Sequence, residues 1–338
     1  MAKINFQCET ITPMFCYGAD QNTPEIRAAS IKGGLRFWWR ALNGHLVENN
    51  DYSKLRKKET EIFGGSGFTY KGKNGDKIEV PAQRSKVVIR VKNGPNYNEL
   101  VESFEIPENS FYKIEYNKIK YSPVPHKPEG KNFPQPCIPC GTNFDVELKL
   151  VKDIKFEKER NFNLESLKSL FIIYSILGGI GKRSRRGFGS FKIVNYQIND
   201  KEIEEFEYSE NVLQENFKQI IADRLNTNEG KIEISSNRDK NYPYLRNVQL
   251  GKTANYNTLL SDIGKESSKN SYSDYTGFAK GNNRLSSPLY VSIYPINNEL
   301  AIVFSELNCS FNSGWNPQGK INAINNFRQN LQEEKNEK

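Results

Sequence analysis

The sequence has no hydrophobic run that approaches the ~20 residues needed to span a bilayer. Its first residues, MAKINFQCETIT, alternate in polarity and lack the apolar run of a signal peptide. We therefore expect a cytoplasmic protein that makes no membrane contact. The five cysteines are expected to stay reduced in that compartment, so they provide no disulfide framework.

Histidine is scarce, which limits the acid/base chemistry available to the chain. The two histidines are His45, on the apolar stripe of a predicted helix, and His126, among prolines in a predicted exposed loop. Neither has a convincing partner nearby in the sequence, and a packed core role is favoured for His45 over a catalytic one. Asp20 and Glu25 lie near a basic segment but do not form the carboxylate pair of a metal nuclease. We predict no catalytic residues.

Metal-ligating residues are also few. Cys137 and Cys140 form one CxxC, whereas a structural zinc site needs about four ligands. Cys8 and Cys16 are able in principle to complete the set, but the flanking prolines favour a turn that leads into a strand. The sequence therefore predicts no metal site and no cofactor.

What the chain does have is a large apolar fraction and an excess of positive charge. Its 338 residues are 36% hydrophobic and 26% charged, with a formal net charge of +8 and a pI near 9.0. This length and composition predict a globular protein of two modest domains. The charge favours an acidic partner, either nucleic acid or an anionic membrane.

The most unusual stretch is GGIGKRSRRGFGSF, residues 178–191, with five glycines and four cations. A helix is predicted before it, over residues 164–177, and a strand after it, in FKIVNYQI. This order is the reverse of an ATPase P-loop, in which a strand enters and a helix leaves. Arg183 also follows Gly181-Lys182 where Ser or Thr is required, and Ile176 replaces the first Walker glycine. The sequence therefore argues against ATP binding.

The loop instead fits the binding of a phosphate chain. Its glycines allow backbone N–H groups to approach closely and form anion-binding nests, while the side chains supply positive charge. An exposed basic turn without function is the alternative. A membrane patch is disfavoured, because no amphipathic helix places hydrophobic residues beside these cations. The residues concerned are Gly179, Gly181, Lys182, Arg183, Arg185 and Arg186.

A second basic stretch, residues 23–46, predicts a helix with one apolar and one cationic face. Trp38 is assigned to the apolar face and the core. Lys32, Arg36 and Arg40 form the opposite stripe, and Arg27 lies in the segment leading in. Trp39 adjoins that stripe, and two interpretations stay open: its ring stacks on a base, or it is buried against an inserted loop. A solvated helix face explains the charge but not its single sign.

SIKGGLRFWWRA, with TPMFCYGAD and PEIR before it and EIFGG after it, resembles the RAMP proteins of type III CRISPR effector complexes. Among them it is most similar to the family of first subunits of the Cmr (type III-B) complex. GGIGKRSRRGFGSF resembles the glycine-rich loop of the same superfamily. These motifs all lie before residue 192, and the second half of the chain carries no equally distinctive signature.

The resemblance implies an α+β fold of tandem ferredoxin-like (RRM-related) domains with inserted loops. The residue patterns predict the order β-α-β-β-α-β for residues 1–198, with the first helix over residues 31–47 and insertions at residues 49–85 and 93–141. Residues 199–338 are expected to form a second ferredoxin-like domain with a C-terminal helix. Residues 264–284 are polar and rich in glycine and serine, which predicts a mobile loop.

The function implied by the resemblance is a non-catalytic RNA-binding subunit that holds guide RNA, target RNA or both through their phosphates. Its expected partners are single-stranded RNA and other Cmr RAMP subunits. Two alternatives stay open: a metal-independent endoribonuclease that processes CRISPR RNA, and a purely architectural subunit. The predicted RNA-binding residues are Arg27, Lys32, Arg36, Trp39, Arg40, Gly179, Gly181, Lys182, Arg183, Arg185 and Arg186.

Overall fold

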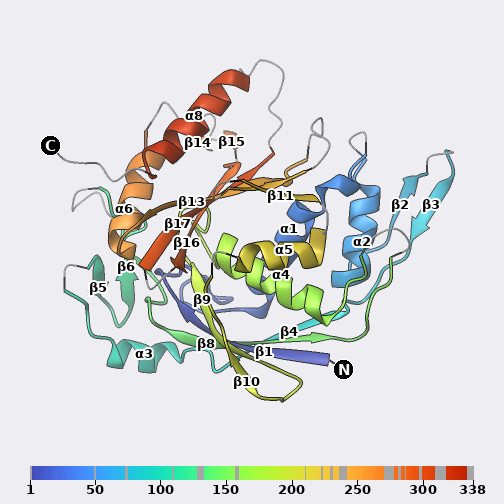
Figure 1. The fold of residues 1–338 in the computed structure, drawn as a ribbon. Coiled ribbons are helices and arrows are strands. Elements are labelled where there is room, and N and C mark those ends of the chain that lie inside the picture. Colours follow the sequence, from blue (N-terminus) through green and yellow to red (C-terminus); the bar gives the residue numbers. More distant parts are fainter. Residues whose placement is uncertain are drawn as a thin grey trace.

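A computed structural model of the chain gives the fold shown in Figure 1. It describes residues 2–332 except 49–50, 73–74, 109, 128–132, 157–159, 210, 222–223, 229–230, 236–241, 270–277, 281–282, 286, 297–298 and 309–316. The fold is mixed α+β with several antiparallel sheets. Within the described residues, every helix is too short or too polar to cross a membrane.

The first half of the chain is built on a five-stranded sheet in the order β10-β9-β1-β8-β4, with every pair antiparallel. Central strand β1 places Phe6 opposite Val146 on one side and Tyr196 on the other. The predicted order β-α-β-β-α-β is confirmed for β1, α1, β4, β8, α4 and β9. Their bounds are β1 Ala2–Thr10, α1 Ala28–Leu42, β4 Val87–Lys92, β8 Asn143–Leu150, α4 Leu164–Leu177, β9 Phe191–Ile198 and β10 Ile203–Glu205.

The first helix differs from its predicted bounds of residues 31–47. It ends at Leu42, and a separate 3-10 turn, η1, covers Gly44–Leu46. At this end both the N–H and the side chain of Asn43 donate to the carbonyl of Trp39, and the N–H also donates to that of Arg40, which tightens the last turn.

The two long connections contain elements of their own. One carries α2, which packs against α1, and a β2–β3 hairpin; the other carries α3 and a small sheet of β5, β6 and β7. Their bounds are α2 Ser53–Phe63, β2 Phe68–Lys71, β3 Lys77–Val80, α3 Tyr97–Ser103, β5 Tyr112–Ile114, β6 Ile119–Tyr121 and β7 Gln135–Pro136.

A second five-stranded sheet, in the order β11-β12-β13-β17-β16, organises the rest of the chain. The predicted loop over residues 264–284 is wrong at its start, because α6 continues to Ser267, and at its end, where β14 pairs with β15; residues 270–277 and 281–282 lie outside the described part. The bounds are α5 Val212–Ile221, β11 Leu225–Asn228, β12 Lys231–Ile234, β13 Leu245–Thr253, α6 Tyr256–Ser267, β14 Phe278–Lys280, β15 Asn283–Leu285, β16 Leu289–Ile296, β17 Glu299–Leu307 and α8 Pro317–Gln329.

Helix α4 lies at the centre, between the two sheets (Figure 1). It begins with a capping box, in which Asn163 accepts from the N–H of Ser166, and nearly all of its residues are buried. Phe171 packs on Phe6 of the first sheet, with ring centroids 4.5 Å apart. At its other end the hydroxyl of Ser292 in β16 donates to the carbonyl of Ile176. The two sheets therefore share one buried core.

Helix α1 offers a matched pair of glycines that tests this packing. A Cβ at Gly34 would overlap the ring of Tyr174 on α4, whereas a Cβ at Gly33 would meet nothing within 4 Å. Gly34→Ala is expected to lower the free energy of unfolding by about 1–3 kcal/mol through overpacking. Gly33→Ala is expected to raise it by up to about 1 kcal/mol, because alanine favours the helix. Urea denaturation of both variants measures the difference, and equal effects would contradict the α1–α4 contact.

Candidate nucleic-acid interface

The glycine-rich loop, residues 178–191, is packed between two distant parts of the chain. The N–H of Lys182 donates to the carbonyl of Phe15 at 2.9 Å, and that of Gly189 donates to Pro13 at 3.0 Å. On the other side the N–H of Gly187 donates to Val291 in β16 at 2.7 Å. The loop is therefore fixed by main-chain bonds on both sides.

The glycines of the loop serve this packing. A Cβ at Gly179 would press on the carbonyl of Phe188, and one at Gly181 would press on that of Phe15. Gly189 combines a φ of +69° with direct contact on the backbone of Ile180. The expected nest of free N–H groups is wrong for Ile180, Lys182, Gly187 and Gly189, because each of these N–H groups already donates to a carbonyl.

Two of the four loop cations point into the protein. Arg186 donates to the carbonyls of Arg185 and Leu289 and to the hydroxyl of Ser287. Burial, followed by the nearby charge of Arg185, lowers the pKa of Arg186 to about 10. Arg185 donates to the carbonyl of Ser287 at 2.9 Å and lies over the ring of Tyr290. The prediction that both arginines are free for phosphate is therefore wrong, since they bind the loop to the second sheet.

The other two loop cations are exposed. Lys182 has its ammonium 4.6 Å from the centre of the Tyr17 ring, which positions it without neutralising its charge. Arg183 adopts a left-handed backbone with φ of +58°; although the residue is exposed, partial desolvation of its guanidinium lowers its pKa. Among the described residues no carboxylate pairs with either side chain. Both are available to an anion.

The cations of helix α1 also fall into a paired group and a free group. Arg36 and Arg40 each donate to the same carboxylate oxygen of Glu59 in α2, at 2.6 Å. The Glu59 side chain is only 7% exposed, so this ion pair is shielded from water, while each arginine stays about a third exposed. The predicted cationic stripe is therefore partly neutralised by the inserted helix.

Trp39 does not present its ring to solvent. It is 3% exposed and belongs to the same buried cluster as Leu55 of α2. Of the two interpretations of Trp39, burial is confirmed and base stacking is wrong, because the ring is not open to solvent. Trp38, assigned to the core, is 1% exposed as predicted.

Arg27 and Lys32 are the unpaired cations at the start of α1. Arg27 is exposed just before the helix, and no side chain caps the first turn, which also contains no acidic residue. Such a helix N-terminus favours an anion. Lys32 is half-buried; desolvation, with Arg36 nearby, lowers its pKa, and no described carboxylate pairs with it.

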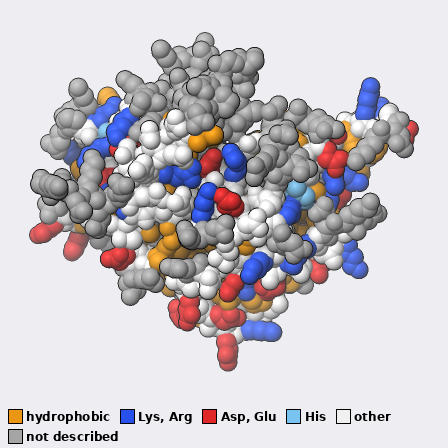
Figure 2. Space-filling view, turned by 45° about the horizontal axis from the view of Figure 1, so that its top comes forward, with side chains coloured by type: hydrophobic (Ala, Val, Ile, Leu, Met, Phe, Trp, Pro, Cys, Tyr) orange, Lys and Arg blue, Asp and Glu red, His pale blue; other side chains and the backbone are white. Residues whose placement is uncertain are grey.

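Main-chain contacts place the segment that leads into α1 next to the loop. Phe15 bridges Lys182, and the carbonyl of Cys16 accepts from the N–H of Glu25, two residues before Arg27. At the other end of α1, Phe37 packs on Tyr290 with centroids 5.1 Å apart, the same ring that Arg185 covers. We call the set Arg27, Lys32, Lys182 and Arg183 the α1–loop surface. On the face shown in Figure 2, lysine and arginine side chains are interspersed with acidic ones.

The fold gives little support to a metal-binding or acid/base role for the cysteines and for His45. Burial raises the pKa of the thiol of Cys137 well above its usual range, which disfavours the thiolate that binds a metal. Among the described residues no group of three or more His, Cys, Asp or Glu is arranged to hold a metal ion. His45 is half-buried in η1.

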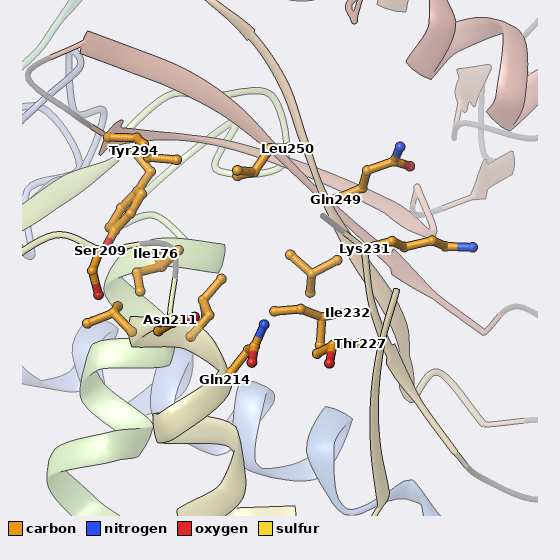
Figure 3. Close-up of a pocket in the computed structure, with 14 residues that line it drawn as sticks. Ile176, Ser209, Asn211, Gln214, Thr227, Lys231, Ile232, Gln249, Leu250 and Tyr294 are labelled. Atoms are coloured by element: carbon orange, nitrogen blue, oxygen red, sulfur yellow. The ribbon is translucent and has the colours of Figure 1, made fainter. Parts of the chain in front are cut away.

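A separate cavity of about 330 Å³ lies between α5 and the second sheet (Figure 3). Ile176, Leu250 and Tyr294 are among its lining residues, and Lys231 is the one charged residue among those that the structure describes there. In Figure 3 the Lys231 side chain runs away from Ile176 and Leu250. This cavity does not suit a phosphate chain.

Several residues that shape the site were missed by sequence analysis. Glu59, Tyr17 and Tyr290 hold the cations in place but carry no motif of their own. The EIFGG motif, which begins two residues after Glu59, was the one available signal for the helix that neutralises Arg36 and Arg40.

Comparison with known proteins identifies the family to which the first half of the chain is similar. The model of the RAMP superfamily matches residues 7–192. The CRISPR system Cmr subunit Cmr1-2 of Pyrococcus furiosus is 33% identical over 189 residues, which cover 56% of this chain and 93% of that protein. Cmr subunit Cmr1-1 of the same organism is 31% identical over 193 residues, 56% of this chain and 47% of that protein.

The fold is similar to that of a chain in a solved Cmr complex. A chain of the type III-B Cmr-beta complex bound to cognate target RNA aligns with a TM-score of 0.54 and 13% identity, and 98% of each chain is covered. At this identity the likeness concerns the fold, which extends over both sheets.

Substitution of two loop cations tests which of them stabilises the fold and which is free to bind an anion. Arg186→Ala removes the donor of three carbonyl or hydroxyl acceptors and is expected to lower the free energy of unfolding by at least about 2 kcal/mol. Lys182→Ala, at an exposed position, is expected to change it by no more than about 0.5 kcal/mol. Chemical denaturation measures both. If Arg186→Ala leaves the free energy of unfolding unchanged, the hydrogen bonds of Arg186 do not stabilise the contact between the loop and the second sheet.

Proposed function

Because this chain belongs to the RAMP superfamily, we propose that it is a non-catalytic RNA-binding subunit of a type III-B CRISPR (Cmr) effector complex that acts in antiviral defence. The names of its two curated relatives, both Cmr subunits, support this assignment. Its proposed partners are single-stranded RNA, as guide or target, and other RAMP subunits of the complex.

The observation that carries the RNA-binding role is the α1–loop surface. Arg27, Lys32, Lys182 and Arg183 have no carboxylate partner among the described residues, although the chain pairs many of its other cations. Unpaired cations beside an uncapped helix N-terminus suit the sugar-phosphate backbone, which binds largely without base readout. Arg36 and Arg40, each about a third exposed, extend this surface along α1.

The proposed architecture is a pair of ferredoxin-like domains, residues 1–198 and 199–338, with insertions at 49–85 and 93–141. The strand order β9-β1-β8-β4, all antiparallel, supports this for the first domain, because it is the order that a β-α-β-β-α-β unit adopts. In the second proposed domain, β13, β17 and β16 are neighbours in the sheet. Along the chain, α6 follows β13, and α8 follows β17. The insertion helix α2 modulates the site by pairing with α1.

The endoribonuclease alternative has little support from the site. The α1–loop surface contains no histidine, and His45 lies in η1, at the other end of α1 from Arg27. Purified protein that cleaves RNA without metal, and loses this activity on His45→Ala, would favour the nuclease. A protein that assembles into the complex but has no RNA affinity of its own would favour the architectural role.

Salt dependence gives a direct test of the phosphate contacts. Four free cations predict a slope of about −3 in a plot of log affinity against log salt concentration for single-stranded RNA. Fluorescence anisotropy with unrelated RNA sequences, measured across a salt series, gives this slope. A flat plot, or a strong preference for one sequence, would contradict binding through the backbone.

The double variant Lys32→Ala/Lys182→Ala tests which residues make the contacts. It is expected to weaken binding to all RNA sequences alike and to reduce the slope by about 1.4, because each cation displaces about 0.7 counterion. The control is Lys71→Ala/Lys77→Ala, which removes the same charge from the exposed β2–β3 hairpin. An equal loss of RNA affinity in both double variants would mean that the RNA does not bind at the α1–loop surface.

A further inference from the structure

A second basic site lies where the inserted segment, the glycine-rich loop and α6 meet. Its cavity has a volume of about 220 Å³. We call it the His126 pocket. Its lining comprises Pro123, Val124, Pro125, His126, Lys127, Arg183, Arg186, Phe188, Leu260, Gly264, Ser267 and Ser268.

The pocket contains buried polar atoms that lack partners. Both ring nitrogens of His126 are buried without a hydrogen bond, and so is the hydroxyl of Ser267. The ring lies against α6 so closely that a Cβ at Gly264 would overlap it. The prediction that His126 belongs to an exposed loop is therefore wrong for its ring. Leaving such groups unpaired costs about 1–3 kcal/mol each, and a polar ligand that turns the ring toward the cavity would recover this cost.

The charge around the pocket selects an anion. Among the lining residues that the structure describes, none is acidic, and three are the cations Lys127, Arg183 and Arg186. Arg186 already donates to carbonyls of the second sheet, and nearby Lys265 pairs with Asp262 at 3.4 Å. Lys127 and Arg183, both exposed on one side, have no carboxylate partner among the described residues. They are the cations left to hold a ligand.

The protonation state of His126 fits the same ligand. Desolvation, followed by the charges of Lys127, Arg183 and Lys265, lowers its pKa, so the imidazole is neutral at pH 7. A neutral ring offers one N–H donor and one acceptor nitrogen. It can therefore donate to an anionic oxygen and accept from a protonated one, as the hydroxyl of Ser267 also can.

We propose that the His126 pocket binds a phosphomonoester group, from the end of an RNA strand or from a free nucleotide. A terminal phosphate carries close to two negative charges and three acceptor oxygens, which match two free cations, an imidazole N–H and a hydroxyl. Arg183 belongs both to this pocket and to the α1–loop surface. If the phosphate is that of an RNA end, the proposal rests on the proposed function, because a strand held on the α1–loop surface would bring its end to the pocket.

The histidine signals of the full chain test the pocket itself. With only two histidines, labelled protein gives two imidazole signals, which His126→Gln assigns. Inorganic phosphate and adenosine monophosphate are each expected to raise the pKa of His126, because an adjacent anion stabilises the imidazolium, and to leave that of His45 unchanged. An unchanged pKa of His126 with both probes would overturn the proposal.

The source of the phosphate is tested with one RNA oligonucleotide carrying a 5′-phosphate, a 3′-phosphate or only hydroxyl ends. One phosphorylated form is expected to bind about tenfold more tightly than the hydroxyl form. This advantage should disappear in His126→Gln and persist in Lys182→Gln, which weakens all forms alike. Denaturation curves confirm that both variants are folded.

The outcomes separate the pocket from the proposed function. If hydroxyl-ended RNA binds and phosphorylation adds nothing while adenosine monophosphate still raises the pKa of His126, the ligand is a free nucleotide. If neither phosphate probe affects His126 but RNA binds, the pocket assignment is wrong and the α1–loop surface stands. If phosphate binds His126 but no RNA binds the chain, the proposed function is wrong and the pocket stands.

Discussion

The packing of the glycine-rich loop between residues 12–15 and β16 is the constraint on which the rest of the site depends. Main-chain hydrogen bonds to Pro13, Phe15 and Val291 hold the loop from both sides. They require glycines at the points of closest backbone approach, as at Gly189. Because these bonds join the first sheet to the second, a loop that looks like a ligand-binding turn is also the connection between the two halves.

This constraint divides the cations into two groups with different roles. Arg185 and Arg186 bind carbonyls of the second half, and Arg36 and Arg40 share Glu59. Positive charge in these four positions serves packing first, since a buried guanidinium has to satisfy its donors within the protein. Of the predicted RNA-binding cations, Arg27, Lys32, Lys182 and Arg183 have no carboxylate partner among the described residues. Net charge alone therefore overstates the capacity of the surface for phosphate.

The inserted segments determine the chemistry of the site more than their irregular sequence indicates. Helix α2 supplies Glu59, and the proline-rich segment before β7 carries His126 against α6. The RAMP motifs provide the common frame, and these insertions adjust it. His126 comes to lie near Lys127 and Arg183 in this way, at a point where three segments far apart in the chain meet.

The helix–loop–strand order around residues 178–191, the first β-α-β-β-α-β unit and the core position of Trp38 follow from local sequence patterns, because periodicity and capping act over a few residues. Which cations are free depends instead on long-range packing. Arg36 meets its carboxylate 23 residues further along the chain, and Arg186 meets Leu289 at a separation of 103 residues. Local patterns carry no information about such contacts, since they depend on how α4 and the two sheets pack. The burial of Trp39 and of the His126 ring has the same origin.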